Sequence, residues 1–176
     1  AATSGGSNTA VGFFALSTNS TGTGNTAVGQ GALQSSTVSN ATAVGFNALH
    51  TNSTGTANTA VGDSALLRNS SGERNTAIGD SALINSTTGQ GNTAAGAMAL
   101  AQNTAGSGNT AMGVMALQNA ASNVNTAFGA QAGMGITTGG FNTFLGYLAN
   151  ASAGNLSNAT AIGALAMVGQ NNSVVI

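Results

Sequence analysis

The chain has 176 residues, enough for one domain, and its only charged residues are two arginines and three acidic residues. Two arginines cannot form the basic surface that nucleic-acid binding requires. The absence of cysteine excludes a disulfide framework and cysteine-ligated metals. No apolar run approaches the roughly 18 residues of a membrane span. A hydrophobic content of 41% is too high for a typical disordered chain.

A short motif, N-T-A-V-G and its variants, recurs along the whole chain. Its glycine repeats every seventeen residues, with two steps of sixteen. The ten copies predict a single repeat domain over residues 1–176, whose last coil, 164–176, is incomplete. The predicted coils are centred on Gly12, Gly29, Gly45, Gly62, Gly79, Gly96, Gly113, Gly129, Gly146 and Gly163.

Each position of the repeat has its own composition when the motif's glycine is numbered 0. Position −3 is Thr and position +3 is Ala in all ten copies, position −1 is always apolar, and position +4 is Leu in seven. Both sixteen-residue steps lack a second glycine at +10, so the length variation falls in that turn. This second glycine occurs at Gly22, Gly55, Gly72, Gly89, Gly106 and Gly139.

The N-T-A-V segment of each copy predicts a strand, from residues 8–11 in the first copy to 159–162 in the tenth. Seventeen residues are too few for a helix pair, but they fit one coil of a solenoid, with two short strands and with glycine where φ is positive. The predicted fold is therefore all-β, a parallel β-solenoid or β-roll of about ten coils. Stacked about 4.8 Å apart, the coils would form a rod on the order of 48 Å long.

Strand alternation places positions −1 and −3 on one face and positions −2 and −4 on the other. Because position −1 is apolar, we expect −1 and −3 to face the core with the Leu residues. Position −2 would then face outward, yet it is Ala in nine copies, with Phe144 as the exception. This constancy predicts that other chains pack on the outer face. The alternative is that Ala merely tolerates a tight bend.

Two runs of the repeat point to a family. N-A-T-A-V-G at 40–45 and N-A-T-A-I-G at 158–163 resemble the N-x-[small]-A-[I/V]-G repeat of YadA-like heads in trimeric autotransporter adhesins. N-S-V-V-I at 172–176 resembles the same motif cut before its glycine, and similar runs occur in viral and phage fibre proteins. The resemblance implies a homotrimer of left-handed β-rolls on a cell or virion surface. The family's coil is shorter, so we expect residues 17–21 to form a protruding turn.

Few residues could carry chemistry. His50 is the single histidine, and its nearest carboxylate in sequence is Asp63, so we interpret it as a solvated loop residue. Asp63 and Asp80 share a repeat position, about 5 Å apart if the coils stack, and could hold a cation or act as acid and base. A compensating surface patch with Arg68, Glu73 and Arg74 is the favoured interpretation. We predict no enzyme, no catalytic, metal or cofactor-binding residues and no cofactor; the partner-binding residues stay unassigned.

Nine N-x-[S/T] sequons occur, at Asn19, Asn40, Asn52, Asn69, Asn85, Asn150, Asn155, Asn158 and Asn171. Those at 19, 52, 69 and 85 fall in the long turn, where a glycan could be attached. A chain this rich in Asn, Ser and Thr also produces sequons by composition alone, and we favour that interpretation.

These patterns predict a non-enzymatic extracellular fibre domain, either structural or adhesive, that contacts a host or abiotic surface. One alternative is a filament subunit that self-assembles end to end through the last coil. A lesser alternative is an ice-binding solenoid with a Thr array, which an inward-facing Thr at −3 would disfavour. Larger apolar residues gather in the later copies, predicting a thicker core or an interface toward the C-terminal end. They are Met98, Met112, Met115, Phe128, Phe144, Tyr147 and Leu148.

Overall fold

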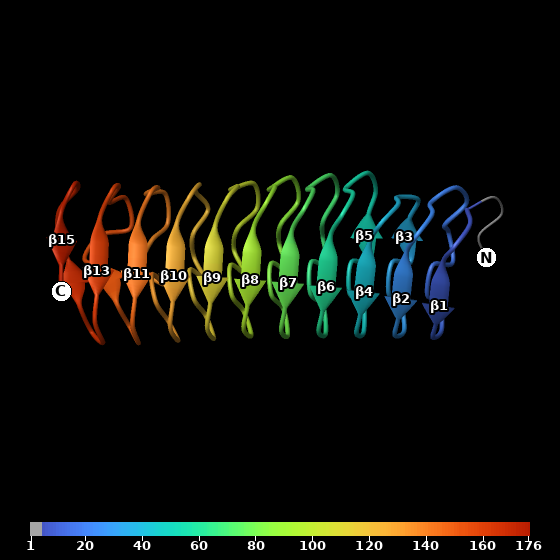
Figure 1. Ribbon diagram of the computed structural model, residues 1–176, viewed down its shortest axis with the longest axis horizontal. Helices are drawn as coiled ribbons and strands as arrows, with labels where there is room; N and C mark the ends of the chain where they lie inside the picture. Colours follow the sequence, from blue (N-terminus) through green and yellow to red (C-terminus); the bar gives the residue numbers. More distant parts are fainter. Residues whose placement is uncertain (1–4) are drawn as a thin grey trace.

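The protein is an all-β rod of stacked coils (Figure 1). A computed structural model describes residues 5–176, so residues 1–4 of the expected domain lie outside the described part. Successive coils lie side by side along one axis, with β1 and β15 at opposite ends. Every strand pair in the described residues is parallel. The parallel β-solenoid predicted from the repeat is confirmed.

One sheet of eleven strands forms a wall along the rod, with one strand from each successive coil. Like positions pair directly, as in Thr26 with Thr42 and Ala27 with Ala43, so each repeat position becomes a ladder of similar side chains. In order, the strands of this wall are β1 (Thr9–Val11), β2 (Thr26–Val28), β4 (Thr42–Val44), β6 (Thr59–Val61), β7 (Thr76–Ile78), β8 (Thr93–Ala95), β9 (Thr110–Met112), β10 (Thr126–Phe128), β11 (Thr143–Leu145), β13 (Thr160–Ile162) and β15 (Val174–Val175).

The second wall of the rod consists mainly of turns, and the expectation of two strands in every coil is wrong. Two small parallel pairs occur there, β3 (Ser35–Ser36) with β5 (Thr51–Asn52) and β12 (Asn150–Ala151) with β14 (Met167–Val168). The Leu at +4 has a positive φ, 49° at Leu33 and 48° at Leu49, which interrupts an extended strand. Hydrogen bonding between coils continues nevertheless, since the Leu33 N–H donates to the Ala48 carbonyl at 3.1 Å.

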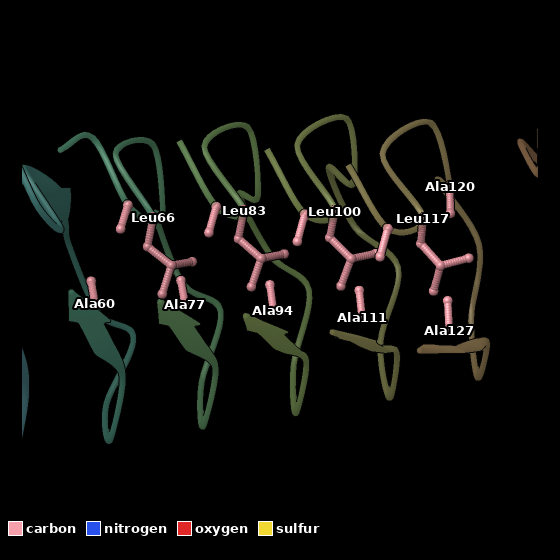
Figure 2. Close-up of a cluster of buried hydrophobic side chains, with 14 of the residues drawn as sticks. Ala60, Leu66, Ala77, Leu83, Ala94, Leu100, Ala111, Leu117, Ala120 and Ala127 are labelled. Atoms are coloured by element: carbon pink, nitrogen blue, oxygen red, sulfur yellow. The ribbon is translucent and has the colours of Figure 1, made fainter. Parts of the chain in front are cut away.

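A Leu ladder from the second wall fills the interior, as the sequence predicts. The Leu side chains point toward the Ala residues at −2 of the strand wall (Figure 2). From Leu33 to Leu117 the Leu residues at +4 are fully buried. The Ala residues at −2 are 0% exposed from Ala27 onward. The core is thin because a small residue on one wall leaves room for a large one on the other.

A ladder of buried Asn at −4 lines the same interior. The Asn92 N–H donates to Asn75 Oδ1 at 2.9 Å, and the Asn92 side-chain amide donates to the Gly106 carbonyl at 2.8 Å. The Asn109 N–H repeats the pattern with Asn92 Oδ1. Because each of these amides bonds to two neighbouring coils, the buried polar groups of this Asn ladder are satisfied.

Glycine is required at two positions of the repeat for different physical reasons. Gly62 has a φ of +135°, and a side-chain carbon there would lie 2.5 Å from the Gly79 carbonyl oxygen. Gly72, the second glycine, does not have a positive φ. A side-chain carbon at Gly72 would instead lie 2.5 Å from Asn69 Oδ1. Positive φ thus explains the first glycine, whereas steric exclusion alone explains the second.

The turn over residues 17–21, which the sequence predicts to protrude, is exposed at Thr18, Ser20 and Thr21. Asn19 is its one buried residue, and its side-chain amide donates to the Gly22 carbonyl at 3.0 Å. The extra residues of the long repeat therefore supply a buried Asn that stabilises the turn.

Two departures from the repeat compensate each other in the core. Position +4 is Gly133 instead of Leu, and position −2 of the next coil is Phe144 instead of Ala. Phe144 is fully buried. A side-chain carbon at Gly133 would lie 2.6 Å from the Phe144 ring and 2.7 Å from the Leu117 side chain. Phe144 thus occupies the volume that Leu occupies in other coils, and it does not pack against another chain as the sequence suggested.

This compensation predicts strong coupling between the two sites. Phe144→Ala alone should leave a cavity and lower the free energy of unfolding by about 3–5 kcal/mol. Gly133→Leu alone should overpack the core and lower it by about 1–3 kcal/mol. The double variant restores the Leu–Ala arrangement and should recover most of the loss. Denaturant titration at one fixed protein concentration measures all three, and additive losses would contradict the proposed exchange of volume.

A second irregularity concerns the buried ladder at +7. Asn103 donates its side-chain amide to the Gly106 carbonyl at 2.9 Å and accepts the Gly106 N–H at 2.8 Å. Ser86 occupies the same position one coil earlier, and its buried hydroxyl oxygen has no partner among the described residues. The Ser side chain is too short to make the pair of bonds with Gly89 that Asn makes with Gly106.

Ser86→Asn should therefore stabilise the coil by about 1 kcal/mol, since it adds hydrogen bonds to a buried and unpaired turn. The midpoint of denaturant unfolding measures the gain. Ser36→Asn is the matched control, because its coil has sixteen residues and carries Ser39 where Gly89 stands. An equal gain in both variants would show that the pairing with glycine is not the cause.

Candidate interaction face

The outer face of the strand wall is the candidate functional surface. It presents two side-chain ladders, Thr at −3 and an apolar residue at −1, held in register by the pairing of neighbouring strands. Most Thr residues of this ladder are partly buried. The exposed members of the apolar ladder are Val11, Val61, Ile78, Met112, Phe128 and Leu145. The face is thus an apolar stripe beside a hydroxyl stripe, both running the length of the rod.

This orientation reverses the sequence prediction, in which −1 and −3 face the core. Ile78 at −1 is 47% exposed, whereas its neighbour Ala77 at −2 is fully buried. Two requirements decide the orientation. The Asn at −4 must reach buried hydrogen-bond partners, and Ala at −2 is the residue that fits opposite the Leu ladder. Both requirements turn −1 and −3 outward.

A signal for this orientation is present in the sequence. Position −2 is Ala in nine copies, as a tightly packed interior demands, whereas position −1 varies from Ala95 to Phe128. Such a range of volumes is hard to fit in a close-packed core. Apolar character alone placed position −1 inside, and its variation in size would have placed it outside.

The charged residues and His50 form no common centre. His50 is partly buried, with its Nε2 3.2 Å from Gln34 Oε1. Asp63 and Asp80 are exposed, and each accepts a hydrogen bond from the hydroxyl of the serine that follows it, at 2.7 Å. Arg68 donates to Asn85 Oδ1 at 3.0 Å. The compensating patch expected around Arg68, Glu73 and Arg74 stays a prediction.

Within residues 5–176 no three His, Cys, Asp or Glu side chains gather as metal ligands, and no pocket is present. No helix in this part of the chain is long and apolar enough to cross a bilayer.

The sequons of the long turn are mostly structural. Asn19, Asn52 and Asn69 are fully buried, and their side-chain amides donate to carbonyls of the turn glycines. Asn85 is partly buried and donates to the Ala101 carbonyl at 2.9 Å. A glycan on any of the three buried residues is incompatible with the folded coil, so the idea that these three carry glycans in the turn is wrong.

The comparisons with known proteins leave the fold and this face as the basis for a functional argument. No protein-family model, curated protein or solved structure matches the chain.

Proposed function

We propose that the chain is a non-enzymatic structural domain of an extracellular fibre, assembled as a homotrimer through the outer face of its strand wall. The observation that carries the proposal is the apolar ladder at −1, which is exposed on the single chain at Val61, Ile78, Met112, Phe128 and Leu145, with partly buried Ala95 between them. A water-exposed apolar stripe of this length is typical of a surface that another molecule covers.

The face can be compared in size with known interfaces. Its eleven strands, about 4.8 Å apart, make it about 50 Å long, and three residues per strand make it about 10 Å wide. The flat area of about 500 Å², enlarged by side-chain relief and by the positions that flank each strand, is what one chain offers to its two neighbours together, against ~800 Å² per partner in a standard interface between two chains.

Identical rods are natural partners for one another. When copies are related by an axis parallel to the rod, each coil lies beside the same coil of its neighbour. The spacing of the ladders then matches along the whole length, and large residues such as Phe128 meet their own counterparts. The number three comes from the resemblance to YadA-like heads, as does the location on a cell or virion surface.

The remaining surface supports an adhesive role. The second wall and its turns expose hydroxyl and amide side chains such as Thr18, Gln102 and Asn119. An assembly of repeated, uncharged coils offers the same weak contact many times. Attachment to a host or abiotic surface would then be multivalent.

Ice binding is a second candidate, because the Thr ladder faces outward instead of inward. A ladder of Thr in register through ten strands is the feature that an ice-binding solenoid presents to ordered water. The apolar ladder beside it ranges from Ala95 to Phe128, which makes the face too uneven to match a lattice. The variation in size therefore favours a protein partner.

The native mass of the purified chain by light scattering, with negative-stain images of the same fraction, tests the proposal. A discrete species of three chains is expected. Open-ended fibres would favour the end-to-end filament instead. A monomer at all concentrations would contradict the trimer, and ice-growth inhibition by that monomer would support the second candidate.

Met112→Lys should break the assembly while leaving the single chain folded. Met112 is 41% exposed in the apolar ladder, and all three acidic residues lie between Asp63 and Asp80 on other coils, so no acidic partner on the same coil offsets the loss of hydration. Light scattering should report a single-chain mass, and circular dichroism an unchanged β spectrum. Gln102→Lys adds the same charge on the exposed second wall and should keep the assembly intact. Equal behaviour of the two variants would remove the strand wall from consideration as the interface.

A further inference from the structure

The exposed apolar surface is unevenly distributed along the rod. Three of the six exposed aromatic side chains among residues 5–176 lie on two successive coils near the C-terminal end, and the others are Phe13 and Phe14 on the first coil and Phe46 on the third. We define the C-terminal apolar patch as Val124, Phe128, Phe141, Leu145 and Tyr147, which are 47%, 40%, 66%, 47% and 55% exposed. Phe128 and Leu145 are directly paired between β10 and β11. The other three flank these strands, two before the strand and one after it, so the patch spans the full width of the wall.

Two residues of the patch also have an unfavourable backbone. Val124 and Phe141 stand at position −5 with φ values of 57° and 61°. The left-handed region is an outlier for a β-branched or bulky residue. In five other coils this position holds Gly or Asn, which adopt the left-handed region more easily: Gly24, Asn40, Gly91, Gly108 and Asn158. The remaining three coils have Ser7, Ala57 and Arg74 there, also with positive φ. Val124 and Phe141 therefore destabilise the isolated chain twice, through backbone strain and through exposure. Another surface that covers these side chains would remove the penalty of exposure, whereas the positive φ is imposed by the coil, because the residues at −5 in the other coils share it.

The chemistry of the patch selects its partner. All five charged residues of the chain lie between Asp63 and Asp80, several coils away. A charged ligand or partner would find no complementary charge in the patch. A second copy of the chain presents the same uncharged surface at the same coil spacing, and it continues the interface proposed for the strand wall.

We propose that a second copy of this chain docks on the C-terminal apolar patch, and that these two coils supply most of the association energy. The inference rests on the proposed assembly through the strand wall, and it adds that one end of the rod contributes most of the binding. A few buried residues carry most of the binding energy at protein interfaces, and aromatic residues are enriched there. The coils centred on Gly62, Gly79 and Gly96 offer less, because Asp63, Asp80 and Ala97 stand where Tyr147 stands in the patch. The third coil has an aromatic residue there, Phe46, but its neighbours in the wall are smaller. These coils would extend a pairing that the C-terminal coils establish.

The first coil carries a second pair of exposed aromatics, which provides a control. Phe13 and Phe14 are 66% and 50% exposed, with ring centroids 3.9 Å apart. Their rings partly cover each other, and both residues lie on one flank of the wall, after the strand. Phe14 also has a positive φ, 60°. It thus shares the exposure and the backbone strain of Phe141 at the opposite end of the rod.

The test compares Phe141→Asn with Phe14→Asn. Asn tolerates the left-handed region and is the native residue at the equivalent positions, Asn158 and Asn47, so both variants should fold. Phe141→Asn should raise the concentration of half-assembly about tenfold or more, as expected for loss of an aromatic anchor. Its single-chain unfolding midpoint should stay the same or rise. Phe14→Asn should change half-assembly less than about threefold. Dilution series by analytical ultracentrifugation measure assembly, and thermal unfolding at low concentration measures the single chain.

The outcomes separate the two proposals. If Phe141→Asn assembles as the unchanged chain does, or if Phe14→Asn weakens assembly equally, the dominant role of the C-terminal apolar patch is wrong while the proposed assembly stands. If the unchanged chain is a monomer throughout, both fail. Tyr147→Gln provides a second variant, since Gln30 occupies the same repeat position. It should also weaken assembly about tenfold, and an unaltered assembly would contradict the inference.

Discussion

The structure depends on the in-register pairing of each coil with the next. Hydrogen bonds between strands of adjacent coils, such as that from the Thr59 N–H to the Asn75 carbonyl, align equivalent residues so that each position of the strand wall forms a ladder. The glycine at position 0 lets the turns of adjacent coils lie close together: a side-chain carbon at Gly62 would lie 2.5 Å from the next coil's carbonyl oxygen. Once pairing is fixed, the identity of one ladder decides the environment of its neighbours. Leu opposite Ala and Asn beside Asn fill the interior, and the remaining ladders face the solvent or a partner.

The fold was predictable because its constraint is periodic. A spacing of seventeen residues, glycine at fixed positions and Ala at +3 are visible without any structure, and they define the coil. The direction in which a ladder faces was harder to predict. Val61 and Ile78 are apolar and extended, so local chemistry placed them in the core. A requirement from the opposite wall outweighs the apolar character of position −1, because the Leu ladder leaves room only for Ala on the strand wall. The distance between the two walls sets that room, and it becomes known only when the coil is closed.

The same reversal changes the argument for association. From the sequence, constant Ala suggested a covered outer face; in the structure Ala77 is constant because it is buried within its own chain. A partner is still expected, but it would contact different residues, those of the apolar ladder at −1. Gly133 in place of Leu and Phe144 in place of Ala likewise show that packing across the core is hard to predict from the sequence. Each departure is visible in the sequence, but their compensation appears only when the two walls are brought together.

The succession of similar coils, each bonded chiefly to its two neighbours, also determines how the rod would respond to force. A pull applied at one end loads the hydrogen bonds of the terminal coil first, because interior coils are held from both sides. Each released coil of seventeen residues would add about 60 Å of extended chain. A fibre built from such a domain would lengthen in steps of similar size under load, and it would keep its remaining coils folded while doing so.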